Sequence, residues 1–199
     1  MTEPIDPRAE MDWMQTFSGR AFYPLDPRPE DIDINDIAIG LARECRFSGQ
    51  CRAYYTVAEH SVLVSYDIEE RYALEGLLHD AAEAYLRDLT APVKRALRVI
   101  ESGRGGSATG RSSYDQLEDA VCRAISARFG LLYPFPDAVK VSDQRVLLAE
   151  YRDALDPPPR PRKEMGAPSS CRVLGLNPQA ARQNFLDRFA DIMKQRSPS

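Results

Sequence analysis

Hydrophobic residues recur along much of this chain at intervals of three and four, the spacing of an α-helix that buries one face. The segment from residue 70 to 85 is the clearest case, because apolar side chains fill positions 74, 77, 78, 81, 82 and 85. The same spacing predicts helices over residues 34–45, 56–68, 92–99, 114–129, 137–155 and 178–195. No stretch alternates with period two for long enough to make a sheet, so the sequence predicts an all-α fold.

Residues that favour helix ends support these boundaries. Thr56 and Glu59 have the spacing of a capping box, and Asn35 or Asp36 is placed to cap the first helix. Gly130 follows the helix predicted over 114–129 and suits its carboxyl end. The local signals therefore agree with the hydrophobic pattern.

Two segments interrupt the helical pattern. Residues 101–113 are rich in glycine, serine and arginine, which predicts a flexible surface loop. Residues 157–176 begin with a proline-rich run that cannot be helical, which predicts an extended segment before the C-terminal helix over 178–195. With 199 residues in all, we expect a single domain over 1–199.

Composition narrows the class of protein. A hydrophobic fraction of 43%, a net charge of −4 and no apolar run of 18 residues indicate a globular protein with no membrane span. The N-terminus lacks the basic start and apolar core of a secretory signal, so we expect a cytoplasmic protein with free thiols. The acidic balance argues against stable nucleic-acid binding, but it allows small anionic ligands at a local basic patch.

The candidate chemistry centres on the two histidines of the chain, His60 and His79. Asp80 follows His79 directly, and both lie beside an apolar stripe, while His60 shares a helical face with valines. Asp143 lies with Val139 and Val146 on the inner face of the helix predicted over 137–155. Burying such groups is costly unless they are paired or bind a metal, and two imidazoles with two carboxylates suit a divalent cation. The alternative is that each histidine is an ordinary hydrogen-bonded core residue.

The strings YTVAEHSVLVS, LLHDAAEAYLRDLTAPVK and VKVSDQRVLLAE resemble the HD-domain metal-dependent phosphohydrolases. Within that superfamily they are similar to bacterial and phage 5′-deoxynucleotidases and deoxynucleoside triphosphate triphosphohydrolases. The resemblance covers about residues 15 to 155, and GRAFYPLDP resembles the phage-type members. It implies a helical bundle with a divalent metal (Co, Mn, Zn or Mg) held between core helices by His60, His79, Asp80 and Asp143.

The resemblance also implies roles around the metal. Glu83 matches the acidic residue that orients the attacking water or protonates the leaving oxygen. Contacts with phosphate, base and sugar are implied for Arg46, Phe47, Asp88, Pro92 and Lys94. Structural alternatives stay open, because Pro92 can simply start a helix, Asp88 can cap one, and the basic residues can be solvated.

Three features limit the resemblance. Gln50 stands where many relatives have a histidine, and the HD-x-x-E-D and GYP strings of two other HD branches are absent. The ligand motif does not separate monophosphate from triphosphate substrates. Further phosphates could be bound by five basic residues, or these could form an ordinary solvated face: Lys94, Arg95, Arg98, Arg104 and Arg111. The sequence therefore predicts a phosphohydrolase of deoxynucleotides that could form homo-oligomers, and its alternative is a regulatory module that binds metal and nucleotide without turnover.

Overall fold

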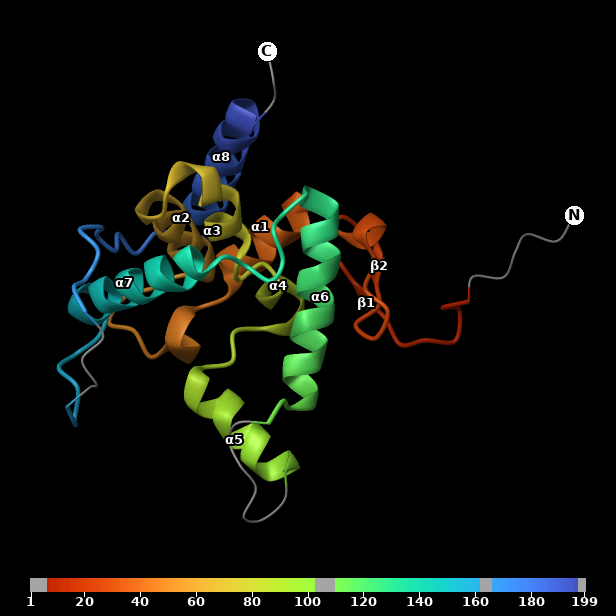
Figure 1. Ribbon diagram of the computed structural model, residues 1–199, viewed down its shortest axis with the longest axis horizontal. Helices are drawn as coiled ribbons and strands as arrows, with labels where there is room; N and C mark the ends of the chain where they lie inside the picture. The colour runs from red at the N-terminus through yellow and green to blue at the C-terminus, as the bar shows by residue number, and fades with distance from the viewer. Residues whose placement is uncertain (1–6, 103–109, 162–165, 197–199) are drawn as a thin grey trace, which may run out of the picture.

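The computed structural model describes residues 7–102, 110–161 and 166–196 (Figure 1). Its α-helices are α1 (Ile34–Arg43), α2 (Val57–Asp67), α3 (Ala73–Leu78), α4 (Glu83–Leu86), α5 (Ala91–Glu101), α6 (Ser113–Phe129), α7 (Asp137–Asp153) and α8 (Pro178–Arg196). Short 3₁₀ helices are η1 (Pro29–Asp31), η2 (Arg46–Gly49) and η3 (Glu70–Tyr72). The prediction of an all-α fold is confirmed, with one addition: β1 (Met14–Gln15) and β2 (Ala21–Phe22) form a small antiparallel hairpin.

Helix α2 forms the centre of the bundle. It is buried along most of its length, and α1, α3, α7 and α8 all pack against it (Figure 1). Helices α5 and α6 extend to one side of this core, and α5 has no buried residue. Polar groups on a buried helix need partners, and α2 buries four polar residues: Glu59, His60, Ser61 and Ser65.

Two helix ends have the predicted residues, and the start of the first helix does not. The Thr56 hydroxyl accepts a hydrogen bond from the Glu59 backbone N–H, and Gly130 ends α6 in the left-handed conformation. The first helix is capped by Asp33 rather than by Asn35 or Asp36, so that prediction was wrong. The capping box at Thr56 is only half formed, because the Glu59 carboxylate instead accepts from the backbone N–H groups of residues 174–176.

The continuous helix predicted over residues 70–85 is wrong. The chain forms η3 and α3, then a tight turn over residues 79–82, then α4. In the turn the backbone bonds link residues three apart, as in Glu83 N–H to Asp80 O at 3.0 Å. These bonds wind the chain more tightly than an α-helix does. His79 and Asp80 thus lie on a turn whose backbone stays close to helical, and this is why the apolar spacing continues through it.

The two irregular segments are only partly described. Residues 103–109 of the predicted 101–113 loop and residues 162–165 of the predicted extended segment lie outside the described residues. Residues 157–161 and 166–176 contain no helix. Among the described residues, no helix has the length and apolar composition needed to cross a membrane.

Gly40 allows α1 to lie directly against α4, whose first residue is Glu83. A Cβ atom at Gly40 would lie 2.8 Å from the Cβ of Ala84, closer than two carbon atoms can approach. We expect Gly40→Ala to lower the free energy of unfolding by about 1–3 kcal/mol, the usual cost of overpacking. Thermal denaturation would measure this, with Ala38→Gly as a control that creates space in α1; a melting temperature equal to that of the unmodified protein would contradict the close contact.

Candidate metal centre and adjoining cavities

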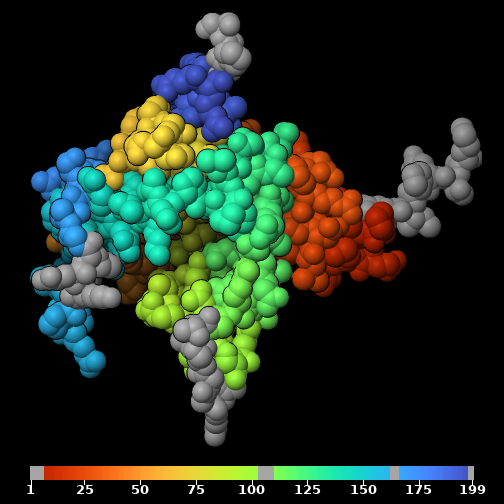
Figure 2. All heavy atoms as spheres, viewed as in Figure 1, coloured from red at the N-terminus to blue at the C-terminus, as the bar shows by residue number. Residues whose placement is uncertain are grey.

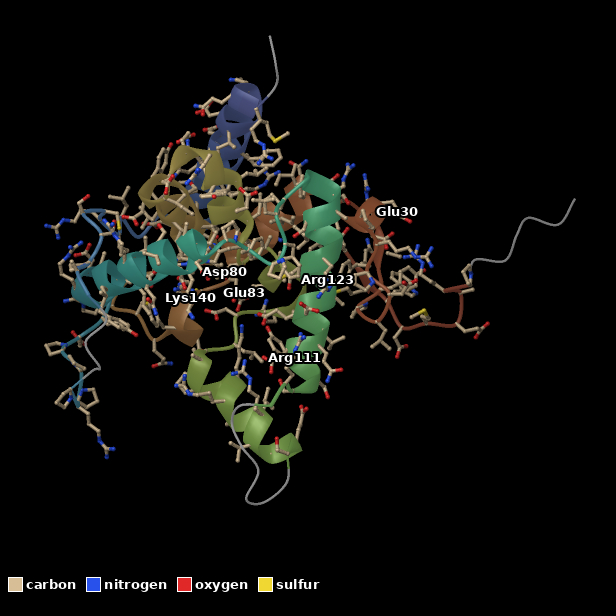
Figure 3. All side chains as sticks on the ribbon, viewed as in Figure 1. Glu30, Asp80, Glu83, Arg111, Arg123 and Lys140 are labelled. Carbon is tan, nitrogen blue, oxygen red and sulfur yellow. The ribbon has the colours of Figure 1, made fainter. Side chains whose placement is uncertain are left out.

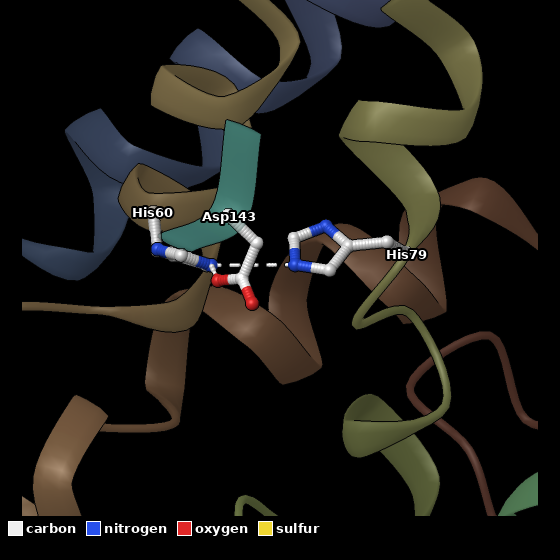
Figure 4. A group of neighbouring side chains, drawn as sticks. All are labelled: His60, His79 and Asp143. Atoms are coloured by element: carbon white, nitrogen blue, oxygen red, sulfur yellow. Dashed lines mark hydrogen bonds and ion pairs between the residues drawn. The ribbon is translucent and has the colours of Figure 1, made fainter. Parts of the chain in front are cut away.

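Three side chains from distant parts of the sequence meet beneath α7. His60 comes from α2, His79 from the turn after α3, and Asp143 from α7 (Figure 4). One ligand atom from each lies within 4.8 Å of the others, and His60 Nε2 lies 3.3 Å from both His79 Nε2 and Asp143 Oδ1. Two imidazole nitrogens and a carboxylate at these distances could hold a metal ion.

Asp80 lies beside this group. Its Oδ2 atom is 3.2 Å from His79 Nε2 and 3.5 Å from His60 Nε2. The four residues that the sequence singled out as metal ligands are therefore brought together. None of the cysteines lies in the ligand group found among the described residues.

The hydrogen bonds on the far side of each ring select a tautomer. His60 Nδ1 lies 2.6 Å from Glu150 Oε1, and His79 Nδ1 lies 2.8 Å from the carbonyl oxygen of Gly76. A carboxylate and a carbonyl can only accept, so each Nδ1 carries the proton and each neutral ring presents the lone pair of Nε2. When both rings are neutral, the two lone pairs face each other at 3.3 Å. A cation between them removes this repulsion, so the residues present fit a metal.

Charge balance at the centre also favours a cation. Burial and the Arg46 guanidinium lower the pKa of His60, but the carboxylates of Glu150 and Asp143 outweigh them and raise it to about 9. The pKa of Asp80 is lowered, because His79, His60 and Arg46 together outweigh the effect of burial. The cluster thus attracts positive charge. Protons supply this charge when no metal is bound, and a divalent cation would take their place on binding.

Glu83 begins α4 and is 6% exposed. Figure 3 shows Asp80 and Glu83 together near the centre of the molecule. Burial raises the pKa of Glu83 well above its usual value, and the charges of Asp80 and Asp88 raise it further. Its Oε2 atom is buried with no hydrogen-bond partner among the described residues. A carboxyl group whose pKa is raised in this way keeps its proton to higher pH and is a candidate proton donor.

A cavity of about 490 Å³ opens beside the ligand group, in the hollow between α7 and α5 that Figure 2 shows. The residues predicted to contact substrate all line it, and its walls include Arg46, Phe47, Asp80, Glu83, Asp88, Pro92, Lys94 and Asp143. Its remaining walls are mostly apolar: Leu89, Thr90, Ala91, Leu147, Tyr151 and Leu155. Charged groups thus lie at the metal end and apolar groups elsewhere, as in a site for an amphiphilic ligand.

Arg46 links this cavity to the buried groups behind it. Its Nη2 atom donates to Glu150 Oε2 at 3.0 Å, and its Nη1 atom lies 3.6 Å from Asp80 Oδ2. Its Nε atom is buried and has no hydrogen-bond partner among the described residues. The following residues, Phe47 and Ser48, have φ angles of +54° and +53°, a strained backbone of the kind that gathers at functional sites.

A second cavity of about 590 Å³ lies on the other side of His79 and Asp80, against α6. Three of the basic residues that could face further phosphates line it, and each is paired with an acidic residue of α6. The pairs are Lys94–Glu118 at 2.6 Å, Arg98–Asp115 at 2.7 Å and Arg111–Asp119 at 3.6 Å. Because Asp80 also lines this cavity, the described residues of its lining carry no excess of positive charge.

Sequence reasoning missed two residues at the site. Glu150 is fully buried and contacts both His60 and Arg46, and Tyr151 packs against Phe47 with ring centroids 6.1 Å apart. Glu150 lies seven residues after Asp143, on the same face of α7 as Val139 and Val146. A glutamate on that apolar face was the available signal. The pKa of its carboxyl lies well below the usual range, because Arg46 and His60 outweigh the effect of burial.

Comparison with known proteins places the chain beside two bacterial proteins. No family model matches it. It is 35% identical over 189 residues to "Uncharacterized protein YfdR" of Escherichia coli, an alignment that covers 94% of this chain and 98% of YfdR. It is 41% identical over 137 residues to "Uncharacterized protein RCAP_rcc00048" of Rhodobacter capsulatus, covering 64% of this chain and 63% of that protein. The similarity to YfdR spans nearly the full length of both proteins, and the chain therefore belongs to the YfdR family.

Proposed function

We propose that this protein is a metal-dependent phosphohydrolase of the HD-domain type, which releases phosphate from 2′-deoxynucleoside 5′-monophosphates. The observation that carries the proposal is the convergence of His60, His79, Asp80 and Asp143 beside a cavity. Two of the side chains that line this cavity have a buried polar atom with no hydrogen-bond partner among the described residues. Those atoms are Arg46 Nε, a donor, and Glu83 Oε2. A phosphate ester in the cavity would supply an acceptor for the first and a leaving oxygen for the second.

The four ligand residues would hold the divalent cation (Co, Mn, Zn or Mg), which when bound polarises a phosphate oxygen and lowers the pKa of a coordinated water. Arg46 adds fixed positive charge next to the phosphate. Water adds to phosphorus, the bond from phosphorus to the 5′-oxygen breaks, and neutral Glu83 donates its proton to that oxygen. The products are a nucleoside and inorganic phosphate, and Glu83 recovers its proton from the attacking water.

The ion pairs of the second cavity favour a monophosphate over a triphosphate. Lys94, Arg98 and Arg111 each already contact a carboxylate of α6, so binding further phosphates there would mean breaking these pairs. The added phosphates would also face Asp115, Glu118 and Asp119. Such like-charge contacts weaken binding. Release of tripolyphosphate from dATP is the outcome that would reverse this choice.

Asp88 supports a preference for the deoxyribose sugar. It lines the cavity half-buried, and it does not cap the next helix, since the N-cap residue of α5 is Thr90. Its carboxylate can accept a hydrogen bond from the 3′-hydroxyl and leave little room at the 2′ position. A buried polar contact of this kind discriminates by about 1–3 kcal/mol, so we expect kcat/KM for dAMP to exceed that for AMP by about ten- to a hundredfold.

The ratio of kcat/KM values for dAMP and AMP, repeated in Asp88→Asn, measures this preference and its cause. We expect the ratio to fall in the variant. Asp26→Asn is a matched control, because Asp26 lies in the N-terminal region and lines neither cavity. Equal rates on both sugars would remove the deoxyribose preference, and an unchanged ratio in Asp88→Asn would remove Asp88 from it.

A screen for released phosphate over nucleoside mono- and triphosphates, with each of the four metals added in turn, tests the function as a whole. We expect phosphate from deoxynucleoside monophosphates and no tripolyphosphate. Binding of metal and nucleotide without any product would favour the alternative, a regulatory module that does not turn over.

A further inference from the structure

One buried carboxylate of α7 contacts both the metal group and the phosphate-facing arginine. Glu150 Oε1 lies 2.6 Å from His60 Nδ1 and accepts a hydrogen bond from the Tyr55 hydroxyl at 2.7 Å. Its other oxygen, Oε2, accepts from Arg46 Nη2 at 3.0 Å. The two oxygens of one side chain thus hold donors from three different residues.

Glu150 acts from behind the site. It is 0% exposed, and it does not line either of the two cavities described above. Substrate in those cavities would meet Arg46 and the metal group, with Glu150 behind them. Glu150 can therefore affect binding only through the positions of the groups that it contacts, His60 and Arg46.

The contacts of Glu150 with His60 and Arg46 fix two groups that the proposed chemistry uses. The bond to His60 Nδ1 keeps the Nε2 lone pair on the ligand side of the ring. The bond to Arg46 holds a guanidinium whose other terminal nitrogen lies only 3.6 Å from Asp80 Oδ2. Without the Glu150 charge, Arg46 would be free to move onto Asp80 and neutralise a carboxylate that the metal needs.

We propose that Glu150 is a positioning residue that sets the affinity for metal, through His60, and the affinity for phosphate, through Arg46, at the same time. This inference rests on the proposed function. A carboxylate that merely filled the core would change stability and leave both affinities of the folded protein unaltered.

The test is Glu150→Gln, which keeps the size of the side chain but turns one oxygen into an N–H donor. An amide that still accepts from His60 presents its N–H₂ to Arg46, and the flipped amide presents it to His60, so one contact is lost in either orientation. Mn²⁺ affinity is measured by titration calorimetry, and inorganic phosphate affinity is measured on the protein saturated with Mn²⁺. We expect Mn²⁺ binding about 10- to 100-fold weaker, as for other residues that orient metal ligands, and weaker phosphate binding even with saturating metal.

Three further variants separate positioning from stability. Tyr55→Phe removes a hydrogen bond of Glu150 that involves neither His60 nor Arg46, so we expect lower thermal stability with both affinities kept. Asp36→Asn makes the same acid-to-amide change at a buried residue bonded to Ser18, away from the site, and should also keep both affinities. Glu150→Asp keeps the negative charge on a shorter side chain, so we expect the affinity for Mn²⁺ or for phosphate to fall about tenfold. This variant provides the test if Glu150→Gln does not fold.

Unchanged Mn²⁺ and phosphate affinities in folded Glu150→Gln, or in Glu150→Asp, would overturn the proposal. These are binding measurements, so they are independent of turnover. The protein could lose Mn²⁺ and phosphate affinity in the Glu150 variants and yet hydrolyse no nucleotide in its unmodified form. That result would contradict the proposed function and leave the role of Glu150 in place.

Discussion

Replacing Glu83 with glutamine is expected to lower kcat by about a hundredfold or more while leaving the bound metal in place. Glu83 is buried, one of its oxygens has no hydrogen-bond partner in the part of the chain that the structure describes, and burial together with the charges of Asp80 and Asp88 raises its pKa. It is thus the residue in the cavity best able to protonate a leaving oxygen. Glutamine fills the same space and keeps hydrogen-bonding atoms, but it has no proton to transfer.

Rates of phosphate release from dAMP and metal content per chain, measured on the same preparation, would check this prediction. Glu75→Gln is the matched control, because Glu75 is an equally buried glutamate that lines neither of the two cavities. We expect the control to keep its kcat. A nearly unchanged kcat in Glu83→Gln would make Glu83 a structural residue and require another proton donor.

Asp80→Ala is expected to lose most of the bound metal. Asp80 Oδ2 lies 3.2 Å from His79 Nε2 and 3.5 Å from His60 Nε2, so the variant removes a negative charge next to both imidazoles. The two imidazoles would then face each other with one carboxylate fewer to balance a divalent cation. Since the metal supplies the central charge of the proposed reaction, activity should disappear with it.

Metal analysis of purified Asp80→Ala would show this loss directly. Asp119→Ala serves as its control, since Asp119 is an acidic residue of α6 outside the ligand group. Metal content equal to that of the unmodified protein in Asp80→Ala would reduce the ligand set to His60, His79 and Asp143.

The hydrophobic pattern was enough to predict most of the helices, but it could not reveal the turn at His79. Apolar side chains at intervals of three and four suit both an α-helix and the tighter 3₁₀-like turn found over residues 79–82. The difference lies in backbone hydrogen bonds, and in the bond from His79 Nδ1 to the Gly76 carbonyl. The spacing of hydrophobic residues does not depend on the backbone hydrogen bonds of the turn or on the bond from His79 to Gly76.

The candidate site was predictable where a polar residue interrupts an apolar face. Polar residues on apolar faces drew attention to His60, His79, Asp80 and Asp143. The resemblance to HD-domain phosphohydrolases gave these four as one ligand set, and the structure brings them together. The partners of buried glutamates could not be found, because they are set by tertiary contacts. Glu150 meets His60 from 90 residues away, and Glu59 binds the backbone at Leu174 from 115 residues away.

Release of phosphate from dAMP by the purified protein, with and without a divalent metal, tests the proposed function most directly. The protein is stripped with a chelator, and Mn²⁺, Co²⁺, Mg²⁺ or Zn²⁺ is then restored one at a time. We predict no phosphate from the stripped protein, and deoxyadenosine and phosphate in equal amounts once a suitable metal is restored. No product from any nucleoside mono- or triphosphate with any of these metals, in a protein that binds metal, would contradict it.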